Sequence, residues 1–297
     1  MADVALSRAL SLRDYLGIFK PRIAAMIALS AVGGAAVSPG PVSPAALMLT
    51  VAAVFLAAAS AGAFNQWAES DLDAQMARTA SRPFASGRLV PGYRWLAGIL
   101  ALLLFAVGLA AVSANGWAAF HTFMGAFTYA VIYTVWLKRR SWTNIVVGGA
   151  AGSFAVLAGA AAVSPELAPE PVLLAIVLFL WTPPHFWSLA IAVGDEYRSN
   201  AVPMLPALIG DAKCAWVILA HTLALSLIAL LPALYGMGWL YLAGAVIGGS
   251  IFTLTSLQLV LEPTRRRAIR NFLASLLQLL LLLAGAMLDR LASGAVA

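Results

Sequence analysis

The stretch with the most chemical potential, residues 65–83, follows a run without charge over residues 23–64. Asn65, Glu69 and Asp73 are spaced four residues apart, so a helix that continues through them would place all three along one face. Mg²⁺ prefers oxygen ligands of this kind and commonly bridges carboxylates to substrate phosphates. The spacing predicts a magnesium–diphosphate site at a membrane surface, and the alternative is a solvated helix end with ordinary charges.

Basic side chains accompany these oxygen ligands, whereas Asp71 falls off their shared face and is expected to point elsewhere. Arg78 and Arg82 follow in the same stretch, and Lys138 and Arg139 stand at the end of a later apolar segment. Arginine forms bidentate contacts with phosphate oxygens. These four side chains are therefore candidate ligands of a diphosphate, unless they serve only as signals of membrane topology.

A second acidic pair, Asp195 and Glu196, follows the apolar segment 171–192, which contains Trp-Thr-Pro-Pro-His-Phe-Trp. Either carboxylate could bind metal, and the residues leave open which one does. The two prolines predict a kink that frees backbone carbonyls. His185 follows them and is a candidate for contact with a cofactor-like substrate or for acid–base chemistry. The alternative is that His185 only hydrogen-bonds a freed carbonyl.

The composition predicts that membrane helices position these groups. The chain is 62% hydrophobic and 10% charged, with a mean hydropathy of +0.92, whereas soluble proteins carry about 25% charged residues. One crossing needs about 20 apolar residues, so we expect an all-α polytopic protein with a cytoplasmic arm (1–21) and a single membrane domain (22–292). Its predicted spans are 22–38, 44–65, 95–113, 116–136, 143–163, 171–192, 213–234, 238–261 and 269–289.

The basic residues predict the orientation of these spans. All Lys and Arg residues except Arg290 lie in the N-terminal arm, in alternate connections or at the adjoining helix ends. The positive-inside rule therefore places the N-terminus and both acidic segments in the cytoplasm and, with an odd number of spans, the C-terminus outside. Short clusters that flank a membrane do not form a nucleic-acid surface, so no nucleic-acid partner is expected.

Together these motifs resemble the UbiA superfamily of intramembrane prenyltransferases over about residues 15–290. The resemblance rests on Asn65-Gln66, Glu69, Asp73, Met76, Arg78-Thr79 and Arg82-Pro83, on Tyr133-Thr134, Leu137-Lys138-Arg139 and Asn144, and on 181–187, Glu196-Tyr197 and 203–206. The segment 181–187 favours the branch that farnesylates haem over relatives that prenylate aromatic acids.

The resemblance implies nine helices around a central cavity in a bacterial inner membrane, with a cytoplasmic cap over the diphosphate. It implies Mg²⁺ as cofactor, farnesyl diphosphate and haem B as substrates, the lipid bilayer as environment, and downstream haem A synthase or oxidase assembly factors as partners. By matching position, the metal–diphosphate chemistry falls to Asn65, Glu69, Asp73, Glu196 and the neighbouring Asp195, the phosphate contacts to Arg78, Arg82, Lys138 and Arg139, and the haem and prenyl pocket to His185, Tyr133 and Trp187.

The chain departs from the superfamily pattern in two places. Glu69 stands where Asp is frequent, and residues 152–157 lack the expected prolines. Two alternative functions remain: the same chemistry on an aromatic or quinone-precursor acceptor, and membrane transport. A transporter more often places ionisable groups near the midplane of the membrane, whereas those of this chain collect on one face.

Overall fold

The computed structural model describes residues 10–41, 43–194 and 202–294, and every regular element in these ranges is helical. The elements are α1 (Leu12–Ile18), α2 (Pro21–Val37), α3 (Pro44–Ala68), α4 (Ser70–Gln75), α5 (Tyr93–Ser113), α6 (Gly116–Phe127), η1 (Thr128–Leu137), α7 (Asn144–Gly148), α8 (Ala150–Val163), α9 (Pro169–Ala192), α11 (Leu205–Ile209), α12 (Asp211–Ile228), η2 (Leu231–Tyr235), α13 (Trp239–Leu261) and α14 (Arg265–Ala292).

Eight helices in the described ranges are long and apolar enough to cross a membrane, and a ninth crossing is added if α1 and α2, bent by 46°, count as one. The prediction of an all-α polytopic membrane protein is thereby confirmed. Local signals set several helix starts. Ser43 caps α3 by accepting a hydrogen bond from the Ala46 amide, and Pro44 occupies the first helical position, where its missing amide costs nothing.

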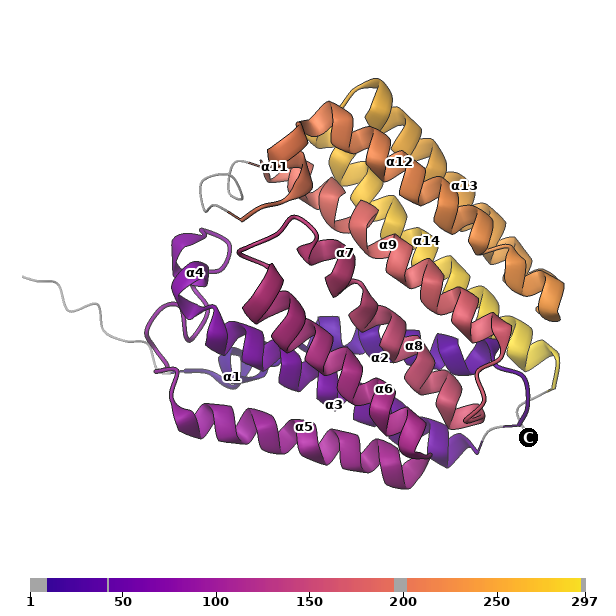
Figure 1. Ribbon diagram of the computed structural model, residues 1–297, viewed down its shortest axis with the longest axis horizontal. Coiled ribbons are helices and arrows are strands. Elements are labelled where there is room, and N and C mark those ends of the chain that lie inside the picture. The colour runs from indigo at the N-terminus through magenta and orange to yellow at the C-terminus, as the bar shows by residue number, and fades with distance from the viewer. Residues whose placement is uncertain (1–9, 42, 195–201, 295–297) are drawn as a thin grey trace, which may run out of the picture.

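The long helices form two groups that lie side by side (Figure 1). Helices α2, α3, α5, α6 and α8 make one group, and α9, α12, α13 and α14 make the other. The first group is held by a close crossing of α2 and α8. A Cβ added at Gly34 would collide with the Val156 carbonyl, and one at Gly159 would collide with the Ala31 carbonyl. Glycine therefore lets the two backbones touch, as small residues do in membrane helix packing.

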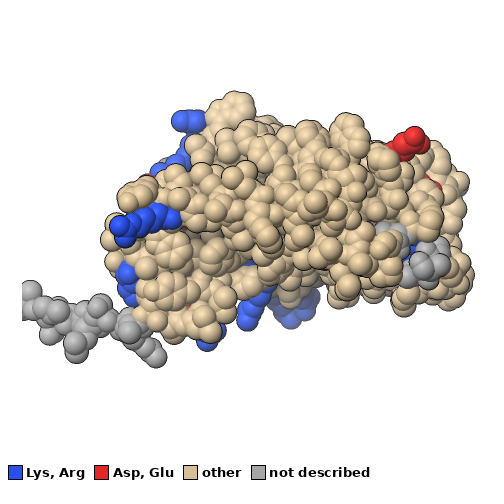
Figure 2. Space-filling model, turned by 90° about the horizontal axis from the view of Figure 1, so that it is seen from below, with Lys and Arg blue, Asp and Glu red and all other residues tan. Residues whose placement is uncertain are grey.

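The two ends of the bundle differ in charge. Helices α1, α4 and α11 lie at one end (Figure 1), and Lys and Arg side chains gather toward that end, while the middle of the visible face carries almost none (Figure 2). At the other end, α14 ties two connections together. Arg290 donates hydrogen bonds to the carbonyls of Ser38 (2.8 Å) and Gly40, and Asp289 accepts one from the Gly238 amide at 2.6 Å.

Two hollows adjoin α3. A cleft of about 510 Å³ separates the end of α3 from η1, and an apolar groove of about 480 Å³ runs between α2 and α3. The central cavity expected from the resemblance stays a prediction.

Helix α9 continues through both prolines as one element. Side-chain hydroxyl groups donate hydrogen bonds to carbonyls near the prolines: Ser188 to the Pro184 carbonyl at 2.6 Å, and Thr182 to the Leu178 carbonyl at 3.0 Å.

Candidate functional site

The end of α3 carries the first acidic motif. The single helix expected through residues 65–73 is interrupted at Glu69, whose backbone (φ −111°, ψ 19°) separates α3 from α4. Turn hydrogen bonds still connect the motif, because the Glu69 amide donates to the Asn65 carbonyl at 3.0 Å and the Asp73 amide donates to the Glu69 carbonyl at 2.8 Å. The break falls between Glu69 and Asp73, so Asp73 belongs to α4 while Asn65 belongs to α3.

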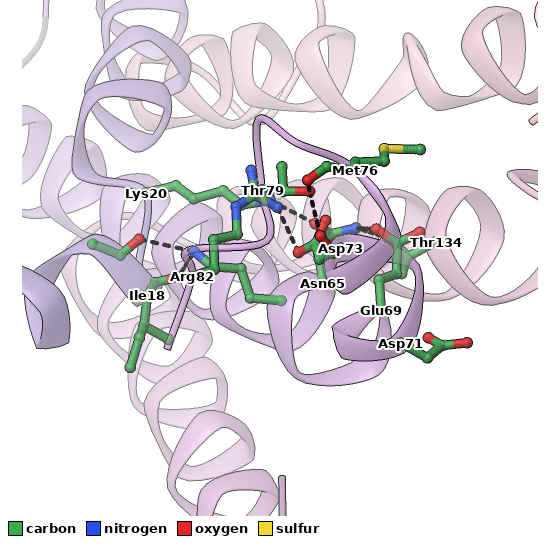
Figure 3. Close-up of polar contacts among 12 residues, drawn as sticks. Ile18, Lys20, Asn65, Glu69, Asp71, Asp73, Met76, Thr79, Arg82 and Thr134 are labelled. Carbon is green, nitrogen blue, oxygen red and sulfur yellow. Dashed lines mark hydrogen bonds and ion pairs between the residues drawn. The ribbon is translucent and has the colours of Figure 1, made fainter. Parts of the chain in front are cut away.

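Glu69 lies at the centre of a buried polar group and is only 2% exposed. Its Oε2 accepts hydrogen bonds from Lys138 Nζ at 2.5 Å and from Asn65 Nδ2 at 2.6 Å. Asn65 Nδ2 also donates to Thr134 Oγ1 at 2.9 Å (Figure 3). Glu69 Oε1 is buried and has no hydrogen-bond partner. An unpaired buried carboxylate oxygen is costly, so this atom is the acceptor best placed to bind a ligand.

Helix η1 determines where Lys138 lies. This π-helix continues α6, and the Lys138 amide donates to the Tyr133 carbonyl five residues earlier at 2.9 Å. Such π-helical turns occur frequently at functional sites. Here the wider turn carries Thr134 and Lys138 to the side chains of α3, and Lys138 Nζ also lies 5.7 Å from the centre of the Tyr133 ring.

Asp73 forms a second, partly buried ion pair beside Glu69. It is 4% exposed, and its Oδ2 accepts a hydrogen bond from Arg82 Nη1 at 2.6 Å. Thr79 Oγ1 donates to the Asp73 carbonyl at 2.9 Å, which holds the loop between the two partners in place. The structure therefore brings together Asn65, Glu69, Asp73, Arg82 and Lys138, and their roles at a metal–diphosphate site stay a prediction.

Lys20 belongs to the same group, although the sequence alone assigns it only to the N-terminal arm. Its Nζ donates to Asn65 Oδ1 at 2.5 Å and to the Tyr129 hydroxyl at 3.3 Å. Lys20 and Glu69 lie on opposite sides of Asn65 (Figure 3). Burial lowers the pKa of Lys20 to about 8. The available signal was a lysine directly before the first apolar span, but the positive-inside rule alone accounts for such a residue.

Other basic residues of the motif face solvent. Arg139 holds Asp71 through two hydrogen bonds of 2.9 and 2.7 Å, and the two side chains are 46% and 61% exposed. The Arg139 guanidinium holds the pKa of Asp71 below its usual value. Asp71 thus points away from the buried group, as predicted (Figure 3). Arg78 is also exposed. The cleft beside η1 connects the two regions, because Glu69 and Arg139 both line it.

The second acidic segment lies outside the described residues, so Asp195 and Glu196 cannot be placed. The residues that flank it nevertheless converge on the first segment. Leu72 and Met76 pack in one hydrophobic cluster with Ala190 of α9 and with Met204. The ends of the predicted second and sixth spans are therefore neighbours at one end of the bundle.

His185 lies in the second helix group. Its ring stacks between Trp181 and Phe272, with centroid distances of 4.2 and 4.5 Å, and Nδ1 shares a hydrogen bond of 2.7 Å with Ser275 Oγ. The ring is thereby clamped between α9 and α14, through a hydroxyl rather than a freed carbonyl.

The two other residues predicted to line the haem and prenyl pocket, Tyr133 and Trp187, lie in different surroundings. Tyr133 stacks on Tyr129 at 5.4 Å and belongs to the polar group. Trp187 is 1% exposed and packs with Ile218 and Leu259 in a hydrophobic cluster. Its contact with substrate stays a prediction, as does that of His185.

The oxygen donors suit a hard cation. Within the described residues, no group of three or more His, Cys, Asp or Glu side chains is arranged to hold a metal ion. The unpartnered Glu69 Oε1, the adjacent Asp73 carboxylate and the Asn65 amide oxygen are the hard ligands that Mg²⁺ prefers. The donor set therefore fits Mg²⁺ in type. In this structure Lys20 bonds the Asn65 amide oxygen, and Arg82 bonds one Asp73 oxygen.

Sequence comparisons cover nearly the whole chain. The profile of the UbiA prenyltransferase family matches residues 26–284. The chain is 52% identical to Protoheme IX farnesyltransferase 2 of Paramagnetospirillum magneticum, over 96% of this chain and 99% of that protein. It is 46% identical to Protoheme IX farnesyltransferase 1 of the same organism (95% and 99% covered) and 40% identical to the Protoheme IX farnesyltransferase of Alkalilimnicola ehrlichii (94% and 92%).

Solved structures agree in fold. A UbiA homolog from Aeropyrum pernix K1 superposes with a TM-score of 0.72 at 23% identity, covering 91% of this chain and 98% of that one. A UbiA homolog from Archaeoglobus fulgidus, bound to DMAPP and Mg²⁺, superposes with a TM-score of 0.68 at 14% identity (91% and 99% covered).

Proposed function

The chain belongs to the UbiA prenyltransferase family, and from that premise we propose that it transfers a farnesyl group from farnesyl diphosphate to a vinyl group of haem B. The products are haem O and diphosphate. The observation that carries the proposal is 52% identity, over almost the full length of both chains, to a protein named protoheme IX farnesyltransferase. The buried group around Glu69 supplies matching chemistry, because it combines metal ligands with cations for an anionic leaving group.

We assign the Mg²⁺ ligands to Asn65, Glu69 and Asp73 on one side and to Asp195 or Glu196 on the other. The unpartnered Glu69 Oε1 supports this assignment, and so does the Mg²⁺ bound with DMAPP in the Archaeoglobus homolog. When bound, Mg²⁺ offsets the negative charge that develops on the departing diphosphate.

The cations of the site are already paired before substrate binds. Lys138 holds Glu69, Arg82 holds Asp73, and Lys20 holds the Asn65 amide. In our proposal Lys138, Arg82 and Lys20 would bind the phosphate oxygens of the substrate, while Glu69 and Asp73 would bind the metal. Substrate binding then exchanges partners and leaves no buried charge unpaired, which would otherwise be strongly destabilising. Arg78 and Arg139 receive the diphosphate at the exposed edge of the site.

The cations then lower the barrier to ionisation. As the farnesyl C–O bond breaks, its electron pair leaves with diphosphate, and Lys20, Lys138 and Arg82 stabilise that growing charge. The farnesyl carbon is attacked by the electron pair of the haem vinyl group, which forms the new C–C bond. Water adds to the resulting cation and loses a proton, giving the hydroxyethylfarnesyl group. The face of Tyr133 can steady a cation, and we place haem against His185 and Trp187.

The reaction is proposed to occur at the cytoplasmic face of the membrane. The chain is a multi-span membrane protein of a bacterial family. The basic end of the bundle (Figure 2), where α1 and α4 lie (Figure 1), supports a cytoplasmic N-terminus and a periplasmic C-terminus in the inner membrane. Farnesyl diphosphate would enter from the cytoplasmic side, while its apolar tail stays in the membrane interior.

A labelling experiment separates this function from its rivals. Purified protein in nanodiscs is incubated with radiolabelled farnesyl diphosphate and Mg²⁺, together with haem B, with 4-hydroxybenzoate, or with no acceptor. Label in a porphyrin product is expected with haem B only. Label in the benzoate product would instead indicate an aromatic acceptor. Absence of both products, with uptake of label into proteoliposomes, would indicate a transporter.

A further inference from the structure

The turn between α1 and α2 holds an unusual backbone conformation. Lys20 has φ 48° and ψ 54°, the left-handed region, and it is the only non-glycine residue with positive φ among those described. A side chain is disfavoured there, and such residues persist when their surroundings hold them. The same turn aims Lys20 Nζ at Asn65 Oδ1, 2.5 Å away. The backbone strain therefore lies in Lys20, the same residue whose side chain reaches the polar group around Glu69.

One residue of α3 holds this turn. Gln66 is 3% exposed, and its Nε2 donates hydrogen bonds to the carbonyls of Gly17 at 2.8 Å and Ile18 at 3.1 Å. These carbonyls belong to the last turn of α1, where acceptors have no partners inside the helix. The Gly17 carbonyl also accepts a hydrogen bond from the Lys20 amide at 3.3 Å. Gln66, which belongs to α3, thus caps the C-terminal end of α1. The capped Ile18 carbonyl lies two residues before Lys20 in the chain.

The neighbouring turn of α3 completes the arrangement. Gly62 lies four residues before Gln66, and a Cβ added there would lie 3.4 Å from both Cβ and Cδ of Lys20. The aliphatic stem of Lys20 therefore packs directly on the α3 backbone. Gly62, Asn65 and Gln66 share one side of the helix, so this side receives the stem, the ammonium group and the preceding turn.

We infer that Gln66 is a positioning residue for the diphosphate site: by anchoring the end of α1 it keeps Lys20 directed at Asn65. The inference rests on the proposed function, because it is the diphosphate that Lys20 would bind. Gln66 itself touches no reacting group. A purely structural Gln66 would affect the stability of the protein and both substrates alike, whereas a positioning role affects farnesyl diphosphate through Lys20 alone.

The test is a double-mutant cycle of Gln66→Met and Lys20→Met. Methionine keeps the length of glutamine and removes both donors. We expect Gln66→Met to raise the KM for farnesyl diphosphate about tenfold, the effect of losing one hydrogen bond to a charged group, with the KM for haem B unchanged. The double variant should match Lys20→Met alone. Ser60→Ala is the control, because Ser60 also donates from α3 to a buried carbonyl, that of Ile99 at 2.8 Å.

A second readout avoids dependence on turnover. Isothermal titration of inorganic diphosphate with Mg²⁺ should show the same tenfold weakening for Gln66→Met and none for Ser60→Ala. Should Gln66→Met fail to fold, Gln66→Asn keeps the amide but falls one methylene short, and the same loss is expected. Additive effects of the two variants, a parallel rise in the KM for haem B, or unchanged diphosphate affinity would each overturn the inference. A wild-type protein that neither turns over nor binds diphosphate would overturn the proposed function itself.

Discussion

Replacing Asp73 by Asn should separate catalysis from folding. The substitution keeps the shape of a side chain that is 4% exposed, and its amide oxygen can still accept the hydrogen bond from Arg82. Folding then loses only the charge assistance of one hydrogen bond, about 1–2 kcal/mol. The metal site loses a charged ligand in the transition state, and several kcal/mol of charge stabilisation are at stake there. With about 4 kcal/mol lost, turnover should fall about 10³-fold.

Asp71→Asn is the matched control, because the same change is made two residues away on the same helix. Asp71 pairs with Arg139 in solvent, with 61% of its side chain exposed, and such pairs contribute about 0–1 kcal/mol. Turnover should stay within about threefold of wild type. The assay is incorporation of labelled farnesyl into haem, beside thermal unfolding in detergent. A folded Asp73→Asn protein with more than about a tenth of wild-type activity, or equal damage from Asp71→Asn, would refute the reasoning.

Three further predictions address the ion pairs, the metal and the opposite end of the bundle. Lys138→Met should destabilise the protein by about 3 kcal/mol, because it leaves the buried Glu69 carboxylate without its cation, and adding Glu69→Gln should restore thermal stability but not turnover. Chelation of Mg²⁺ should abolish label transfer, and excess Mg²⁺ should restore it, whereas Ca²⁺, with its longer ligand distances, should not; equal rates with EDTA would contradict the assigned metal. Arg290→Met should lower stability by about 1–2 kcal/mol through its lost bonds to Ser38 and Gly40, with unchanged KM values, and a shifted KM would show that this end communicates with the site.

The transmembrane architecture could be predicted because its physical determinants are local. The thickness of the hydrocarbon core sets the length of each apolar run, and the placement of basic residues sets its direction. The spacing of Asn65, Glu69 and Asp73 was equally local, so their grouping was predictable. The break in the helix at Glu69 was not, because no glycine or proline within residues 65–73 marks it.

The partners of these ligands could not be read from the chain, because they depend on which helix faces which. A π-helix that has no marker in the sequence brings Thr134 to Asn65 and Lys138 to Glu69. Lys20 reaches Asn65 only because Gln66 and the turn after α1 direct it there. Likewise, Ser275 comes from the last span to meet His185, a pairing that only the packing of α14 on α9 creates.

The contacts of α14 also constrain how the protein is made. Through Arg290 and Asp289 the last span fastens the far ends of the first hairpin and of the α12–α13 hairpin, and it packs along α2 as well. A polypeptide enters the bilayer from its N-terminus onward. Helix α2 therefore lacks its contacts with α14 until α14 has been inserted. A chain that stops before α14 would therefore expose to lipid the side of α2 that packs against α14 in the complete bundle.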